Sequence, residues 1–119
     1  MATKWTVKTH ERYLVEAASF SFRAHQTDTA TRLLRLVDIT DPIEISQIRK
    51  SARKTRTHRD TQHSMFVAVG RIDVYTHIVN SGEVKMPPKK FLASLASIRE
   101  NLESRALDYN IILRRILAA

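Results

Sequence analysis

The sequence contains no cysteine, only two glycines and three prolines, and 7% aromatic residues. Without cysteine the chain has neither disulfides nor thiolate metal sites, so association between subunits is the remaining common way to bury more surface. No apolar run approaches the ~18 residues that a membrane-spanning helix needs, and we expect neither a span nor a secretory signal. With 119 residues, 43% of them apolar, we expect one domain over residues 1–119.

Motifs of common catalytic and metal sites are also missing. There is no glycine-rich phosphate loop, no G-x-S-x-G turn and no cysteine nucleophile. The five histidines do not follow the spacing of a metal motif; they are His10, His25, His58, His63 and His77. We therefore expect a protein that binds a partner, with no catalytic residues, no metal, no cofactor and no small-molecule substrate.

Positive charge is concentrated in one segment. The formal net charge is +8, and the segment from Arg49 to Arg59 holds six lysines and arginines and no acid. Such a cluster repels itself unless an anion neutralises it, and release of counterions from a polyanion makes that neutralisation favourable. The segment predicts a nucleic-acid partner, and a solvated basic loop is the alternative interpretation.

Hydroxyl side chains flank these cations, as is typical of contacts to a phosphate backbone. Aromatic residues, which would stack on unpaired bases, are absent from residues 47–65, so the sequence predicts limited base readout. The predicted RNA-binding residues are Ser46, Arg49, Lys50, Arg53, Lys54, Arg56, Thr57, Arg59, Thr61 and His63.

Short alternations of polar and apolar residues favour strands in the first two thirds of the chain, about residues 4–80. Ser19 to Phe22 and Ile43 to Ser46 alternate, and Met65 to Val69 is a short apolar run. The predicted strands are Lys4–Thr9, Tyr13–Ala18, Phe20–Ala24, Arg32–Ile39, Ile43–Lys50, Thr61–Val69 and Val74–Asn80.

Turn residues suggest how these strands connect. Asp41-Pro42 separates two of them, and Gly70 to Asp73 is typical of a hairpin, which together indicate an antiparallel meander. An alternative stays open for Glu11 to Val37, which could form one or two helices with Leu33, Leu34 and Val37 on one face.

The pattern changes to a helical period after Ser81-Gly82. Pro87-Pro88 suits a helix start, and apolar residues then recur every three or four positions over about 88–118, as one helix or two. The predicted fold class is therefore α+β, an N-terminal antiparallel β meander followed by one or two C-terminal α-helices. Because the stripe is wider than one partner surface requires, we expect it to form a dimer interface through Phe91, Leu95, Ile98, Leu102, Tyr109, Leu113 and Ile116.

Two stretches carry a resemblance to the coat proteins of single-stranded RNA bacteriophages. Asp41 to Ser51 followed by His63 to Val69 is similar to the RNA-facing strands of that family, and Val74 to Glu83 running into Lys89 to Leu95 resembles its last strand and first helix. The resemblance implies an interlocked homodimer with a continuous sheet, single-stranded RNA bound to a basic sheet face, a closed icosahedral shell, and a virion location after assembly in the host cytoplasm.

A second resemblance covers only the end of the chain. Tyr75 to Gly82, followed by Lys85 to Pro88 and Phe91-Leu92, looks like the neck or tail-completion proteins of long-tailed DNA phages, which pair a hairpin with a helix. A general nucleic-acid-binding module is the third interpretation of the same charge pattern.

Overall fold

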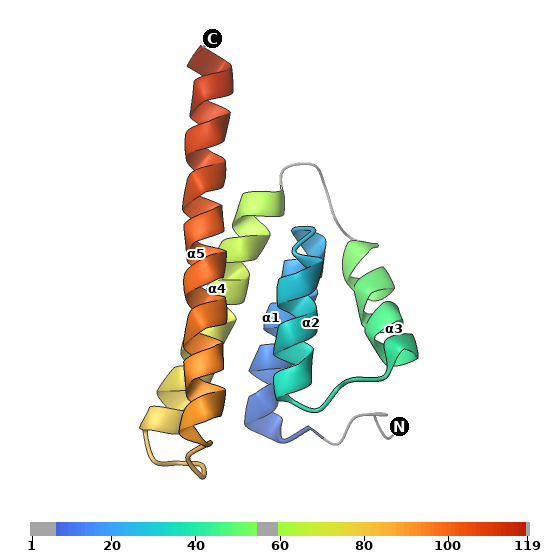
Figure 1. Cartoon of the computed structure of the whole chain (residues 1–119), viewed down its shortest axis with the longest axis vertical. Coiled ribbons are helices and arrows are strands. Elements are labelled where there is room, and N and C mark those ends of the chain that lie inside the picture. Colours follow the sequence, from blue (N-terminus) through green and yellow to red (C-terminus); the bar gives the residue numbers. More distant parts are fainter. Residues whose placement is uncertain (1–6, 55–59, 119) are drawn as a thin grey trace.

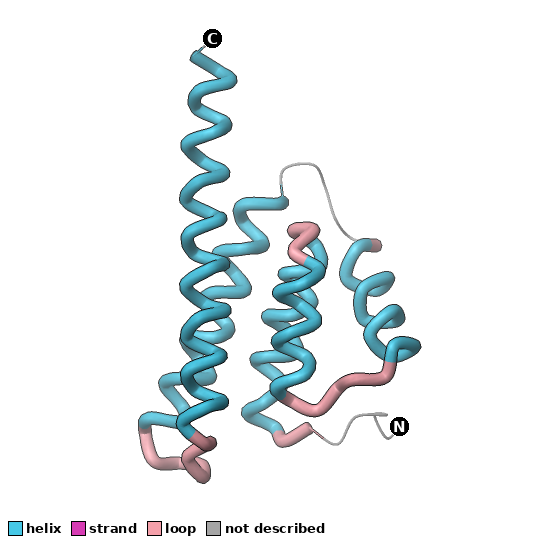
Figure 2. The backbone as a smooth tube through the Cα atoms, in the orientation of Figure 1, coloured by secondary structure: helices cyan, strands magenta, loops and turns pink. Residues whose placement is uncertain are grey.

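Helices account for all the regular structure in the part of the chain that the computed structural model describes. The model describes residues 7–54 and 60–118, apart from the side chains of residues 60 and 110–114. The elements are a 3₁₀ turn η1 (Thr9–Glu11) and five α-helices (Figure 2), α1 (Arg12–Arg23), α2 (Thr27–Leu36), α3 (Pro42–Arg53), α4 (Asp60–Asn80) and α5 (Lys89–Ala118). The predicted α+β fold with an N-terminal meander is therefore wrong.

The predicted strands fall inside these helices. Tyr13–Ala18 and Phe20–Ala24 lie in α1 and its end, Arg32–Ile39 in α2 and its end, Ile43–Lys50 in α3, and Thr61–Val69 and Val74–Asn80 in α4. Lys4–Thr9 lies partly outside the described residues, and its described part leads into η1. An alternation of four residues spans little more than one helical turn, so it fits a helix as well as a strand.

Helices α1 and α2 both end in a Schellman motif with a residue other than glycine in the left-handed position. After α1, His25 has φ 59°, its N–H donates to the Phe22 carbonyl at 3.0 Å, and that of Gln26 donates to Ser21 at 2.8 Å. After α2, Asp38 has φ 61° and the Ile39 N–H donates to the Leu34 carbonyl at 2.9 Å. Because glycine is the usual signal for this cap, neither helix end could be recognised from its residues.

Asp41-Pro42 separates two elements as predicted, but both are helices, and the hairpin predicted at Gly70 to Asp73 is wrong. Asp41 is the N-cap of α3, where its Oδ1 accepts a hydrogen bond from the Ile43 N–H at 2.9 Å, and Pro42 occupies the first turn. Asp-Pro at these positions is a helix start, since proline has no N–H to leave unpaired there. Gly70 to Asp73 lies in the interior of α4 instead of in a hairpin.

Helix α1 lies at the centre of the bundle (Figure 1). It packs against α2, α3 and α4, while α5 packs on α4 and also touches α2. The molecule measures 51 × 30 × 19 Å. The long dimension follows α5, whose C-terminal part projects beyond the other helices.

A single apolar core joins these helices. Leu33, Leu34 and Val37 are buried on one face of α2 and its end, so the helical alternative for residues 11–37 is confirmed. The largest buried apolar side chains of the core are Leu14, Phe22, Leu33, Leu34, Met65, Ile72, Tyr75, Val79, Leu95, Ile98 and Leu102.

The helical period predicted for residues 88–118 is confirmed, and these residues form one helix rather than two.

Polar contacts tie α5 to the bundle on either side of its buried stripe. Arg99 donates from Nε to Asp73 Oδ1 on α4 at 2.6 Å, which raises the pKa of that guanidinium. Arg105 donates from Nη1 to Gln26 Oε1 at 2.6 Å and pairs with Asp28 of α2.

Candidate nucleic-acid interface

Helix α3 carries the described part of the basic segment. Its inner face is formed by the buried side chains of Ile48 and Ala52, and its packing is against α1. Since the helical repeat turns about 100° per residue, Lys50 and Lys54 are placed on the outer face, one turn apart. Both are exposed.

Among the described residues, the cations of α3 differ from several others by having no acidic partner. Arg71, Arg99 and Arg105 form ion pairs with carboxylates of neighbouring helices. Within the described residues, by contrast, no ion pair involves Lys50 or Lys54. Their charge is therefore available to an anion from outside the chain.

Arg53, one of the predicted RNA-binding residues, makes hydrogen bonds within the chain. Its Nε donates to the Phe22 carbonyl at 3.3 Å and its Nη2 donates to the Thr27 hydroxyl at 3.2 Å. These two bonds tie the last turn of α3 to the corner between α1 and α2. Arg53 thus holds the basic helix in place, and a phosphate would have to compete with these contacts.

The other predicted RNA-binding residues do not form one continuous face. Ser46 and Arg49 are half-buried on α3, whereas Thr61 and His63 belong to the first turns of α4. Arg56, Thr57 and Arg59 lie outside the described residues. The predicted basic sheet face is wrong, because its residues belong to separate helices and no sheet is present in the described ranges.

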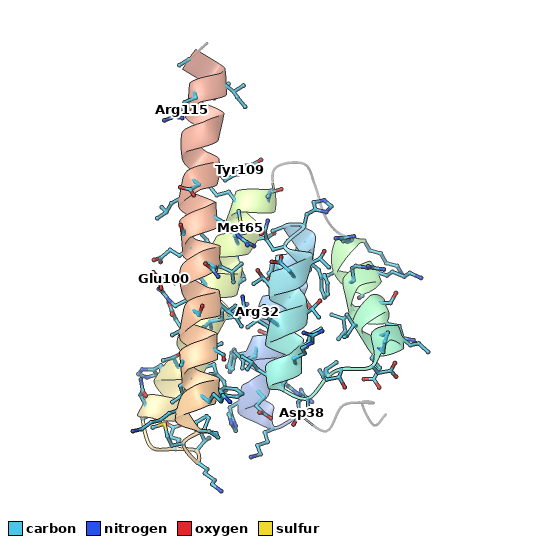
Figure 3. The ribbon with its side chains drawn as sticks, in the orientation of Figure 1. Arg32, Asp38, Met65, Glu100, Tyr109 and Arg115 are labelled. Atoms are coloured by element: carbon cyan, nitrogen blue, oxygen red, sulfur yellow. The ribbon has the colours of Figure 1, made fainter. Side chains whose placement is uncertain are left out.

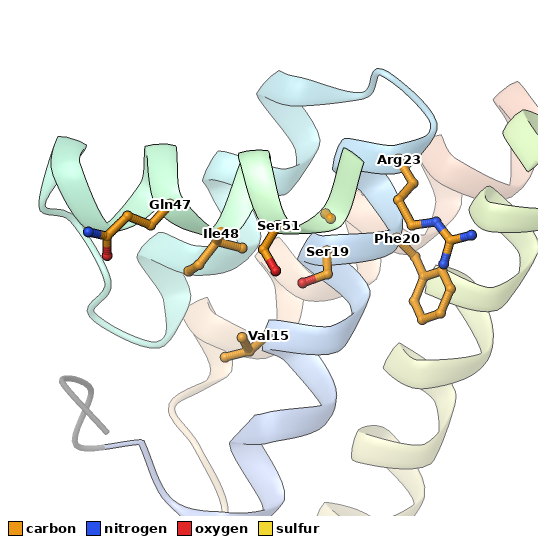
Figure 4. Close-up of a pocket in the computed structure, with 8 residues that line it drawn as sticks. Val15, Ser19, Phe20, Arg23, Gln47, Ile48 and Ser51 are labelled. Atoms are coloured by element: carbon orange, nitrogen blue, oxygen red, sulfur yellow. The ribbon is translucent and has the colours of Figure 1, made fainter. Parts of the chain in front are cut away.

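A cleft of about 530 Å³ opens between α1 and α3 (Figure 4). Apolar side chains form its floor, and the hydroxyls of Ser19 and Ser51 point toward one another across it. The lining residues are Val15, Ser19, Phe20, Arg23, Gln47, Ile48, Ser51 and Ala52.

Phe20 is an aromatic residue that the sequence argument did not connect with the basic segment. It comes from α1, is half-buried, and lies under the guanidinium of Arg23, whose Cζ is 5.1 Å from the ring centroid. An aromatic ring and a guanidinium plane are the two groups on which unpaired bases stack in proteins. Limited base readout was expected because residues 47–65 contain no aromatic residue. Packing of α3 on α1, however, brings Phe20 of α1 to the cleft that α3 lines.

A second cavity lies at the opposite end of the bundle, where α5 begins. It measures about 430 Å³, and its lining includes His10, Tyr75 and Phe91, with Lys8 and Lys85. The His10 and Tyr75 rings stack at 5.8 Å between centroids, and those of Tyr75 and Phe91 lie 6.0 Å apart. These aromatic rings fill space between η1, α4 and α5, and we assign this cavity to the packing of the bundle.

The predicted dimer-interface residues divide into two groups along α5. Leu95, Ile98 and Leu102 are buried within the chain itself and belong to its core, and Phe91 is half-buried against that core. Tyr109 and Ile116 are exposed, and the side chain of Leu113 lies outside the described residues. Among the described side chains of the stripe, those at its C-terminal end are exposed to a partner.

The described residues form neither a metal cluster nor a membrane-spanning helix. No group of three or more histidine, cysteine or acidic side chains in the described ranges is placed to hold a metal ion. None of the described helices is both long and apolar enough to cross a membrane.

Comparisons with known proteins add no relative from which a function could be transferred. No family model matches this sequence, and neither the curated proteins nor the solved structures gave a match. The segments that carry the resemblance to phage coat proteins are helical in this chain, and the shell that the resemblance implies stays a prediction.

Proposed function

We propose that this protein binds single-stranded RNA at α3 and the α1–α3 cleft. The observation that carries the proposal is a cleft between α1 and α3 that contains an aromatic ring under a guanidinium, with two exposed lysines that each follow a lining residue by three positions. Phosphates would be held by the lysines, and an unpaired base would enter the cleft.

The positions along α3 support this arrangement. Gln47 and Ser51 line the cleft. Lys50 follows Gln47 by three positions, and Lys54 follows Ser51 by three positions. Residues three or four apart are neighbours on a helix surface, so the lysines lie along the rim of the cleft. A strand that places its phosphates on this rim would bring a base to the mouth of the cleft.

The chemistry favours an unpaired strand over a duplex. A base inside a duplex is already stacked and paired, and it can enter a cleft only after leaving the helix, which costs a few kcal/mol. A single strand has no such cost, and each base stacked on an aromatic side chain contributes about 1–3 kcal/mol. We therefore expect stronger binding to a single strand than to a duplex of the same length.

The charge contribution is tested by the salt dependence of binding. Replacing both Lys50 and Lys54 with Gln removes two phosphate contacts, which should reduce the slope of log K against log salt by about 1.4 for a single strand. The matched control is Lys89→Gln with Lys90→Gln, two exposed lysines at the start of α5. Equal slopes for the two double variants would exclude α3 as the phosphate site.

The base contribution is tested by Phe20→Leu, which keeps an apolar side chain and removes the ring. We expect affinity for single-stranded RNA to fall about fivefold or more, with little change for a duplex. Phe91→Leu, in the other cavity, is the control. If Phe20→Leu binds both forms as the wild type does, no base enters the cleft.

A further inference from the structure

The C-terminal part of α5 continues the apolar stripe beyond the bundle. The last buried residue of the helix is Ala106, whose carbonyl accepts a hydrogen bond from Gln62 Nε2 of α4 at 2.9 Å. Every side chain described after this point is exposed. Figure 3 places Tyr109 and Arg115 on the part of α5 that extends past the other helices.

Two of the exposed apolar residues of this part, Tyr109 and Ile116, lie on the same face as the buried ones, whereas Leu107 lies on another face. Tyr109 is seven positions after Leu102, and Ile116 seven after Tyr109, so at about 100° per residue all three lie along one line of the helix. The exposed fractions of Tyr109, Ile116 and Leu117 are 37%, 65% and 77%. The stripe thus packs into the core along the N-terminal part of α5 and continues along its C-terminal part, where no described residue covers it. An exposed apolar face of this kind marks an interaction site.

Charges beside the stripe identify the partner. Asp108 and Arg115 are also seven positions apart, which places both on one flank of the stripe. When two copies of a helix pack antiparallel about a two-fold axis, each flank meets the same flank of the other copy with its order reversed. Asp108 then faces Arg115 of the partner subunit, and the same pair forms again on the other side of the axis.

A parallel arrangement lacks this match. There, residues of the same number lie at the same level, so Asp108 would be level with Asp108 of the partner subunit. The order of an acid and a base on one flank therefore favours the antiparallel pair. The axis of that pair passes between residues 111 and 112, which lets Tyr109 and Ile116 face the partner's stripe.

We propose that a second copy of this chain covers this surface, with the α5 segments 107–118 paired antiparallel. This interface is independent of the proposed RNA site. It is short, and interfaces at the small end of the size range form weak and transient complexes, so we expect a dimer that dissociates on dilution. We therefore limit the dimer interface, which the sequence predicted along the whole stripe, to the part of α5 beyond Ala106.

Charge reversal tests the pairing through sedimentation velocity over a range of protein concentrations. Asp108→Arg and Arg115→Asp should each weaken the dimer, because each places like charges opposite one another. An equimolar mixture of the two variants should associate more tightly than either alone, since in the mixed dimer both arginines of one chain face both aspartates of the other. The matched control is Glu100→Arg, on the opposite face of α5, which should dimerise as the wild type does.

Ile116→Asp tests the apolar part and should leave a monomer at concentrations where the wild type dimerises. Circular dichroism of each variant checks that the helices are retained. A wild-type protein that is monomeric at all concentrations overturns the proposal, as does a mixture no tighter than its single variants. Retained dimerisation of Ile116→Asp would likewise contradict it.

Discussion

At the scale of single residues, the two glycines have opposite roles. Gly70 lies in the interior of α4 with open space where a Cβ would stand, whereas Gly82 follows α4 with φ 83°. Gly70→Ala should raise the free energy of unfolding by about 0.5–1 kcal/mol, because alanine loses less backbone entropy in a helix.

Gly82→Ala should lower the free energy of unfolding by about 1–2 kcal/mol, since a Cβ is strained in the left-handed region. Denaturant unfolding of both variants measures the two effects. A Gly70→Ala variant that is not stabilised would contradict the helical assignment around Gly70, and a stabilised Gly82→Ala variant would contradict the strain expected at Gly82.

Tyr75 is the residue whose ionisation should affect stability at alkaline pH. Its side chain is 1% exposed, and its burial, aided by the charge of Glu11, raises its pKa to about 12. The phenol of an unfolded chain has a pKa of about 10. The unfolded state therefore loses its proton first, and the stability that the neutral phenol provides is fully present below pH ~10 and is lost as the pH rises toward ~12.

Unfolding of the wild type and of Tyr75→Phe at a series of pH values isolates this effect. The Phe variant keeps the ring but cannot ionise, so it should lose less stability between pH ~10 and ~12 than the wild type. Parallel losses in the two proteins would show that Tyr75 ionises equally easily in the folded and unfolded chains.

At the scale of elements, α3 depends on its N-cap. The Asp41 carboxylate accepts a hydrogen bond from the Ile43 N–H, and Asp41→Ala should lower the free energy of unfolding by about 1 kcal/mol. Asp41→Asn keeps a side-chain oxygen in the same place and should retain most of the stability. Hydrogen exchange of the α3 amides should be faster in the Ala variant only, and equal exchange in both variants would contradict the role of the cap.

How well the sequence predicted each element depended on the length of its pattern. The stripe of α5 was recognised because it holds a helical period over several turns, whereas Leu33, Leu34 and Val37 span little more than one turn and supported only an alternative to the strand predicted at Arg32–Ile39. The strands were wrong because four alternating residues fit both periods, and because α1 and α2 end without glycine. A short apolar run such as Met65 to Val69 is equally ambiguous, since buried helices and strands both contain one.

The candidate site was predicted only in its charge. Net charge and its clustering can be counted along the chain, so the basic segment was visible as a local feature. The cleft could not be predicted, because Phe20 and Arg23 reach it only when α3 packs on α1. The anchoring role of Arg53 depends on the same packing, which places its guanidinium beside the Phe22 carbonyl.

At the scale of the whole molecule, the two proposed surfaces lie on different helices. The RNA site is formed by α1 and α3, and the self-association surface is the projecting end of α5. A dimer through α5 would carry two RNA sites, so a strand long enough to reach both would bind more tightly than a short one. Ile116→Asp should remove this advantage of length without changing the affinity for a short strand, which filter binding with short and long RNA would measure.

The most direct test of the account is an NMR titration of ¹⁵N-labelled protein with a short single-stranded RNA. We expect the largest amide shifts in residues 15–23 of α1 and 47–54 of α3, which line the cleft and its rim. The amides of residues 89–106 of α5 should shift little, because this part of the helix packs on α4. Shifts centred on another helix, or no shifts at low salt, would contradict the assignment of RNA binding to α3 and its cleft.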